Sequence, residues 1–196
     1  MSKLKVFVVG DNWAIKRWLT KNNCEVVDDP FKAELLQFTG GEDVSPEIYG
    51  EENTHSHNNI LRDMEEMAYF ALARRLEIPM VGICRGAQFL NVMCGGSMVQ
   101  DVKGHTRNHP IYVDVDTQSD FGEIEATSTH HQMMVPADWA SVLAYADVTD
   151  VDDPEIVFYQ EDATCLCFQP HPEYGNHPEL EKLYFELINN YLVRKG

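Results

Sequence analysis

The chain has 196 residues, of which 44% are hydrophobic and 24% are charged, and its formal net charge is −17 at pH 7. This composition is typical of a globular protein with a sizeable core, and we expect a single domain over residues 1–196. The acidic balance argues against nucleic acid and against an anionic membrane surface as partners, because phosphate contacts need lysine and arginine.

Targeting and cysteine content narrow the class of protein further. No apolar run reaches the roughly 18–20 residues of a membrane span. Residues 1–5 lack the features of a signal peptide, so we expect a cytoplasmic protein. The five cysteines, an odd and scattered set, do not form a disulfide framework. We interpret the acidic runs at 28–29, 51–52 and 150–153 as solvated surface.

Short apolar runs recur along the chain and predict strands. Buried parallel strands are expected at residues 6–10, 24–27, 34–38, 78–83 and 163–169. The alternating stretch 111–116 predicts an exposed or edge strand, and 142–148 and 156–160 are expected to pair antiparallel.

Helix-compatible segments alternate with these strands. Helices are predicted over residues 12–20, 62–76, 85–94 and 178–192. The core candidates of the first helix are Trp13, Trp18 and Leu19. The expected core face of the second is Leu61, Met64, Met67, Ala68, Ala71 and Leu72, and that of the last is Leu180, Leu183, Tyr184 and Leu187.

A cysteine with a glycine two residues away on each side separates the strand at 78–83 from the helix after it. The stretch G-I-C-R-G at 82–86 has the layout of a nucleophile elbow, with Cys84 in the place of serine. The peptide dipoles at the start of the helix would stabilise its thiolate, and the N–H of Arg85 would face a developing oxyanion. A packed, unreactive thiol is the alternative interpretation of this stretch.

A second polar motif follows the strand at 163–169, where His171 and Glu173 stand two residues apart between prolines. A thiolate nucleophile needs an imidazole to move its proton, and the imidazole needs an acceptor that fixes its orientation. The glycines at 40–41, Cys84 and His171 each follow a predicted parallel strand. Because functional groups of doubly wound sheets gather beyond the carboxyl ends of the strands, we expect these groups to converge.

The eight histidines show no metal-ligand spacing such as two histidines four residues apart on a helix. We interpret His55 and His57 as polar loop residues rather than ligands. Cys165 and Cys167 would share one face of a strand, and we interpret them as buried thiols rather than a metal or redox pair. The sequence therefore predicts neither a metal nor a cofactor.

Several stretches together resemble a known family. G-I-C-R-G-A-Q at 82–88 and F-Q-P-H-P-E at 168–173 resemble the class I glutamine amidotransferases, whose triad is cysteine, histidine and glutamate. A narrower resemblance is to one branch of this family, the gamma-glutamyl-gamma-aminobutyrate hydrolase type. It rests on the stretches 38–50, 61–66, 91–101 and 128–132. The resemblance implies a flavodoxin-like α/β fold, doubly wound, with a mostly parallel central sheet and a small antiparallel addition.

The same resemblance implies roles for individual residues. Cys84 would be the nucleophile, His171 the general base and acid, and Glu173 its orienting partner. The backbone amides of Gly41 and Arg85 would form the oxyanion hole. The residues that would contact the glutamyl group are Gln88, Ser128, Thr129, His130 and His131.

The expected activity is that of a hydrolase acting on linear amides, either glutamine or a gamma-glutamyl conjugate, through a gamma-glutamyl thioester. As an amidotransferase it would need a synthetase partner to use the ammonia. The rival hypothesis is a catalytically silent module that binds a glutamyl ligand or a partner. The chain departs from the branch in its short segments between 49 and 62 and between 101 and 109, and in Thr127, where asparagine is usual, so the leaving amine is not assigned.

Overall fold

A parallel half and an antiparallel half join in one continuous sheet. The computed structural model describes residues 2–115, 121–147, 153–175 and 177–193. Over these residues a nine-stranded sheet has the order β2-β1-β3-β4-β11-β10-β9-β6-β7. Pairing is parallel from β2 to β11 and antiparallel from β11 to β7. The strands are β1 Lys5–Val8, β2 Glu25–Val26, β3 Leu35–Phe38, β4 Met80–Ile83, β6 His109–Val113, β7 Glu123–Ala126, β9 Ser141–Ala146, β10 Asp153–Tyr159 and β11 Cys165–Phe168.

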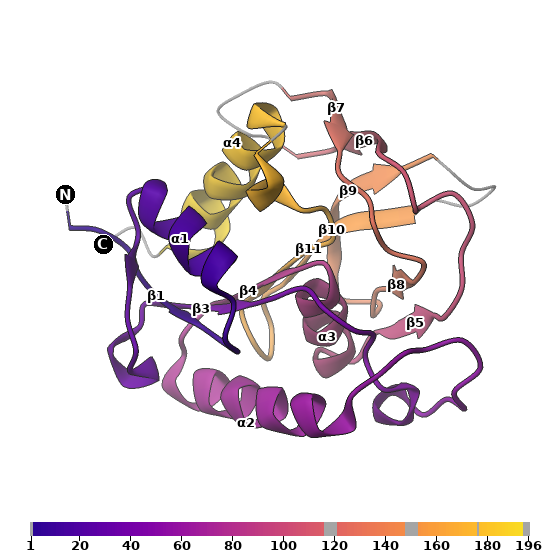
Figure 1. The fold of residues 1–196 in the computed structure, drawn as a ribbon, viewed down its shortest axis with the longest axis horizontal. Coiled ribbons are helices and arrows are strands. Elements are labelled where there is room, and N and C mark those ends of the chain that lie inside the picture. Colours follow the sequence, from indigo (N-terminus) through magenta and orange to yellow (C-terminus); the bar gives the residue numbers. More distant parts are fainter. Residues whose placement is uncertain (1, 116–120, 148–152, 176, 194–196) are drawn as a thin grey trace.

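Helices cover both faces of the parallel half (Figure 1). The helices are α1 Trp13–Lys21, α2 Ile60–Leu76, α3 Arg85–Met93 and α4 Pro178–Leu187. The first and last pack on one face and the middle two on the other. All residues of β3, β4 and β11 are buried, as expected for strands covered on both sides. The predicted α/β class with a parallel central sheet is confirmed.

The antiparallel part is more extensive than the sequence patterns indicate. β9 and β10 pair as predicted, although residue 148 lies outside the described residues. The prediction of an edge strand at 111–116 was wrong for its described residues, because β6 pairs with β9 on one side and β7 on the other. β7 was not predicted. A separate antiparallel pair joins β5 Ser97–Val99 to β8 Met133–Val135.

The packing of α1 and α4 agrees with their expected core faces, apart from one residue. Trp18 and Leu19 are buried together with Ile15, and the expected apolar positions of α4 are buried as well. The prediction for Trp13 was wrong: its side chain is 69% exposed. Trp13 is the first residue of α1. The buried stripe of this helix begins at Ile15 and continues three and four residues later, at Trp18 and Leu19.

The prediction for α2 was wrong about which face is buried. Leu61 and Met64 are 74% and 61% exposed. The buried positions are Asp63, Glu66, Phe70 and Ala73. This stripe includes two acidic residues because Arg85 of α3 forms ion pairs with both of them, and charged residues are buried mainly when paired.

Among the described residues, no helix combines the length and the apolar composition needed to cross a bilayer. All five cysteines are free and buried. Cys165 and Cys167 pack in the core on the side of α2 and α3, in agreement with their interpretation as buried thiols.

Candidate active site

Cys84 lies at the turn between β4 and α3 in a conformation that L-residues rarely adopt, with φ 52° and ψ −116°. The amides of Ala87 and Gln88 donate to its carbonyl, so the cysteine begins the helix. The turn is closely packed, because a Cβ at Gly86 would lie 2.7 Å from the backbone of Phe38. Backbone strain of this kind is concentrated at functional sites.

The imidazole of His171 lies between Cys84 and Glu173. Its Nδ1 is 2.7 Å from Oε1 of Glu173, and the Cys84 side chain is near enough to the ring to raise its pKa. His171 and Cys84 also flank Gly40, where an added Cβ would lie 3.2 Å from Cε1 of the ring and 3.6 Å from the Cys84 Cβ. The ring stacks on Tyr174, with centroids 4.4 Å apart. The cysteine, histidine and glutamate predicted as a triad thus form one contiguous group.

The pKa of His171 reflects opposing influences. Burial lowers this pKa, but the hydrogen bonds and charges of Cys84 and Glu173 outweigh burial and raise it from 6.5 to about 10. The ring is therefore an imidazolium at neutral pH. It can donate a proton to a leaving amine.

Thr127 holds the backbone of His171 through two hydrogen bonds. Its Oγ1 accepts from the His171 N–H at 2.8 Å and donates to the His171 carbonyl at 2.9 Å. A hydroxyl can do both because it carries one donor and two lone pairs. No role was predicted for Thr127. Its only signal in the sequence was its difference from the asparagine that is usual in the branch it resembles.

A pocket of about 200 Å³ opens beside Cys84. Its walls come from the segment after β3 at 41–43, from the start of α3, and from the segment 129–131 between β7 and β8. The cavity is smaller than the roughly 300–1,000 Å³ typical of drug-sized ligands, and it matches a group of amino-acid size. Glu42 and Asp43 contribute carboxylates, and Asp43 is 3.1 Å from Nε2 of His131.

Four of the five residues expected to contact a glutamyl group lie at the pocket, and one lies away from it. Gln88, Thr129, His130 and His131 line the pocket. Ser128 is buried and donates its hydroxyl to the carbonyl of His105 instead.

The two expected oxyanion donors, Gly41 and Arg85, line the same pocket as Cys84. Arg85 is the first residue of α3, and the first amides of a helix have no acceptor within it. Gly41 has φ +149°, and a side chain there would overlap the guanidinium of Arg62. That guanidinium donates to the Gly40 carbonyl at 3.0 Å and so braces the loop that carries Gly41.

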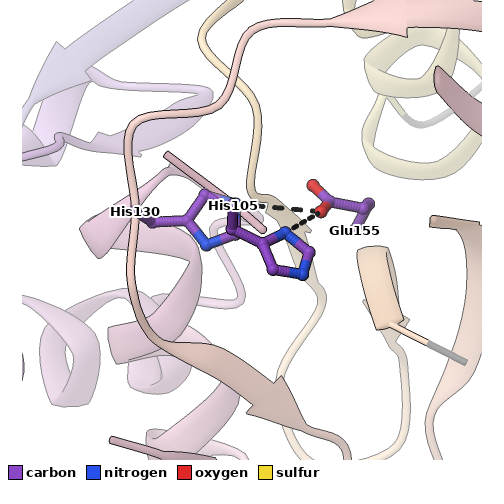
Figure 2. Close-up of side chains that lie close together, drawn as sticks. All are labelled: His105, His130 and Glu155. Atoms are coloured by element: carbon purple, nitrogen blue, oxygen red, sulfur yellow. Dashed lines mark ion pairs between the residues drawn. The ribbon is translucent and has the colours of Figure 1, made fainter. Parts of the chain in front are cut away.

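Behind the pocket wall lies a buried cluster that the sequence did not indicate. His105, His130 and Glu155 offer ligand atoms within 4.8 Å of one another, and all three side chains are buried (Figure 2). Asp153, which was interpreted as part of a solvated acidic run, is also fully buried, at 3.2 Å from His105; that interpretation was wrong for this residue. Residues 150–152 lie outside the described residues.

Burial lowers the pKa of His130 to about 4 and outweighs the nearby charge of Glu155. The pKa of Glu155 moves in the same direction for a different reason. Its burial acts to raise the value, but the imidazoles of His105 and His109 lower it to about 2.

Comparison with known proteins agrees with this geometry. The model of the Peptidase C26 family matches residues 25–173. A protein of Mycobacterium tuberculosis, provisionally named a glutamine amidotransferase, is 32% identical over 157 residues, covering 70% of this chain and 50% of that protein. A carbamoyl phosphate synthase small chain of Solidesulfovibrio magneticus is 27% identical over 98% of this chain and 48% of its own length. The chain thus spans about half the length of these relatives.

Solved structures share the fold. A glutamine amidotransferase from Thermotoga maritima superposes with a TM-score of 0.67 at 16% identity, over 97% of this chain and 84% of that one. The PurLQS structure from the same organism gives a TM-score of 0.66 at 20% identity, over 97% and 99% of the two chains. The family match over most of the sequence shows that the chain belongs to the peptidase C26 family of class I glutamine amidotransferases.

Proposed function

We propose that this chain is a cysteine-dependent amidohydrolase that cleaves the gamma-glutamyl amide bond of glutamine or of a gamma-glutamyl conjugate. The observation that carries the proposal is the strained Cys84 at the start of α3, which flanks Gly40 together with a His171 ring whose Nδ1 lies 2.7 Å from Glu173. Family membership supports amide-hydrolysing chemistry at this thiol.

The proposed reaction has two stages. Sγ of Cys84 attacks the amide carbonyl carbon, and the N–H groups of Gly41 and Arg85 donate to the oxygen that gains negative charge. His171 protonates the leaving nitrogen as the C–N bond breaks, which yields the amine and a gamma-glutamyl thioester. Water then loses a proton to His171 and attacks the thioester, which releases glutamate and the thiolate. Glu173 accepts from Nδ1–H throughout and fixes the ring.

The pocket supports a glutamyl group as the recognised half of the substrate. Its volume of about 200 Å³ matches one amino acid, and the carboxylates of Glu42 and Asp43 suit an α-amino group. His57 and His131, which also line the pocket, suit the α-carboxylate. The gamma-glutamyl-gamma-aminobutyrate hydrolase type remains part of this proposal, with the leaving amine to be assigned by experiment.

Two substrates imply two arrangements in the cell. If glutamine is the substrate, we propose a synthetase partner that consumes the ammonia, because one relative is by name the small chain of a carbamoyl phosphate synthase. Hydrolysis of a gamma-glutamyl conjugate needs no partner. The ratio of turnover on the two substrate types by the isolated protein separates these arrangements.

Glutamate release from glutamine and from a panel of gamma-glutamyl amides tests the activity. We expect release by the purified protein and none by Cys84→Ala. Cys94→Ala is the matched control, because Cys94 is also a buried thiol but ends α3 rather than beginning it. Undiminished glutamate release by Cys84→Ala would contradict the assigned nucleophile.

A labelling experiment separates the enzyme from the silent binding module. A glutamine-mimicking diazo ketone should add once, at Cys84, as located by mass spectrometry of peptides. A folded protein that neither releases glutamate from any amide nor takes up the label would support the module instead.

A further inference from the structure

The cluster of His105, His130 and Glu155 joins three segments that are distant in the sequence. His105 lies between β5 and β6, His130 lies between β7 and β8, and Glu155 belongs to β10. Glu155 has no register partner between Pro154 and Ile156, where β10 shifts against β9. Such a bulge re-aims a side chain. Figure 2 shows the two imidazoles and the carboxylate directed toward one another.

The outward-facing nitrogens of both rings are already engaged. Nε2 of His105 lies 3.2 Å from Oδ2 of Asp153, and Nδ1 of His130 lies 2.8 Å from the Gln132 carbonyl. A carbonyl oxygen only accepts, so the proton of His130 is on Nδ1 and its Nε2 carries a lone pair. Asp153 likewise accepts from Nε2–H of His105, so in the neutral ring Nδ1 would be the nitrogen that can bind a cation.

Among the described residues, three buried atoms of the cluster have no hydrogen-bond partner: Nδ1 of His105 and Nε2 of His130, which both face Oε1 of Glu155, and Oε2 of the same carboxylate. Their side chains are between 0% and 5% exposed. Buried polar atoms are nearly always satisfied, and neutral ring nitrogens that face a carboxylate with their lone pairs repel it. A cation between the three groups would satisfy them together.

The distances and the donor types fit a transition-metal ion, for which Zn²⁺ is the candidate here. Glu155 Oε1 lies 3.4 Å from Nδ1 of His105 and 3.7 Å from Nε2 of His130. Tetrahedral zinc with bonds of about 2.0–2.1 Å separates its ligand atoms by about 3.4 Å. Two imidazoles and one carboxylate are a zinc donor set, whereas Mg²⁺ and Ca²⁺ take oxygen ligands.

The surrounding residues complete the pattern of a metal site. Metal-bound histidines usually donate their other ring N–H to a carboxylate or a carbonyl, as His105 and His130 do here toward Asp153 and Gln132. The ligating carboxylate is in turn hydrogen-bonded, and His109 Nε2 lies 3.0 Å from Oε1 of Glu155.

We propose that His105, His130 and Glu155 bind one Zn²⁺ ion, which ties the wall of the Cys84 pocket to β10. His130 lines that pocket and also belongs to the cluster, so the ion would position a wall of the site without taking part in the reaction. The sequence predicted no metal because the three ligands are 25 residues apart along the chain in each interval.

Metal content and affinity test the proposal independently of any activity. Protein purified without chelator should contain about one zinc per chain by plasma mass spectrometry. After chelation, Zn²⁺ should bind with one-to-one stoichiometry in a calorimetric titration and raise Tm, and Mg²⁺ should do neither. A folded wild-type chain that binds no Zn²⁺ would overturn the proposal, and protons shared among the imidazoles would then have to satisfy the cluster.

Variants locate the ion. His105→Gln and Glu155→Gln should weaken Zn²⁺ binding by more than about 100-fold, and Asp153→Asn by about 10- to 100-fold, with folding checked by circular dichroism. His55→Ala, in an exposed loop, and Cys84→Ala should keep the wild-type affinity. Loss of binding in Cys84→Ala would place the ion on that thiol and overturn the site. The absorption spectrum of Co²⁺-loaded wild-type protein tests the ligands even if a ligand variant fails to fold. We expect no thiolate charge-transfer bands, as for nitrogen and oxygen ligands. Thiolate bands would contradict the proposed ligands.

Discussion

At the scale of single residues, the protonation of His171 decides whether the proposed chemistry can run at neutral pH. Its ring is buried, yet its partners hold a proton on it: Cys84 on one side and Glu173 at 2.7 Å on the other. A ring with a pKa of about 10 is ready to protonate a leaving amine. Cys84, whose backbone is strained, and this ring both lie against Gly40.

Nuclear magnetic resonance of the His171 ring should show a pKa far above 6.5, near 10. The value should fall in Cys84→Ala and in Glu173→Gln, because each variant removes a group that stabilises the imidazolium. The pKa of His171 is higher in the folded than in the unfolded protein. Its imidazolium therefore contributes fully to the free energy of unfolding below about pH 6.5, and this contribution is lost as the pH rises to about 10. A wild-type ring that titrates near 6.5 would contradict the proposed pairing.

At the scale of elements, the contact between β4 and α3 sets the geometry of the elbow. A Cβ at Gly82 would overlap the backbone of Gly86, the second residue of α3. The strand and the helix can therefore approach closely only without a side chain at this position. A displaced α3 would move both the sulfur of Cys84 and the N–H of Arg85.

Gly82→Ala should destabilise the fold by about 3 kcal/mol, at the upper end of overpacking costs, because backbone rather than a flexible side chain must move. Gly122→Ala is the control. It has φ +52°, but no atom of the described residues lies within 4 Å of an added Cβ, so strain alone should cost about 1–2 kcal/mol. Urea unfolding of both variants measures the difference. Equal losses would show that the elbow is not closely packed.

At the scale of the whole molecule, a buried ion-pair network joins α2 to the elbow at Cys84. Arg85 pairs with Asp63 and Glu66, and all three side chains are at most 2% exposed. Glu66 also pairs with Arg62, which donates to the carbonyl of Gly40. One network therefore connects helix α2 to two walls of the pocket, the loop after β3 and the start of α3.

Arg85→Met should cost about 3–5 kcal/mol of stability, because Asp63 loses its ion-pair partner and Glu66 keeps only Arg62. Arg74→Met is the matched control. The Arg74–Asp162 pair has side chains that are 50% and 71% exposed, and its loss should cost less than about 1 kcal/mol. Both values come from denaturant unfolding at the same pH. A small effect of Arg85→Met would mean that water reaches the network.

The sequence by itself determined the parallel strands and the convergence of the proposed site. Runs of apolar residues identified β3, β4 and β11, and these three strands are neighbours in the sheet. Because parallel strands end at the same edge, Gly41, Cys84 and His171 had to come together once the strands paired. The glycines two residues before and after Cys84, and the two-residue spacing of His171 and Glu173, are local features that can be read directly from the sequence.

Only the tertiary structure decided which face of α2 is buried and how the histidines group. Periodicity reports apolar stripes, but α2 buries Asp63 and Glu66 because Arg85 meets them from another helix. Likewise, His105, His130 and Glu155 meet only after three separate segments have packed. Polar side chains are buried when partners elsewhere in the chain satisfy them, and such partners leave no periodic signal in the sequence.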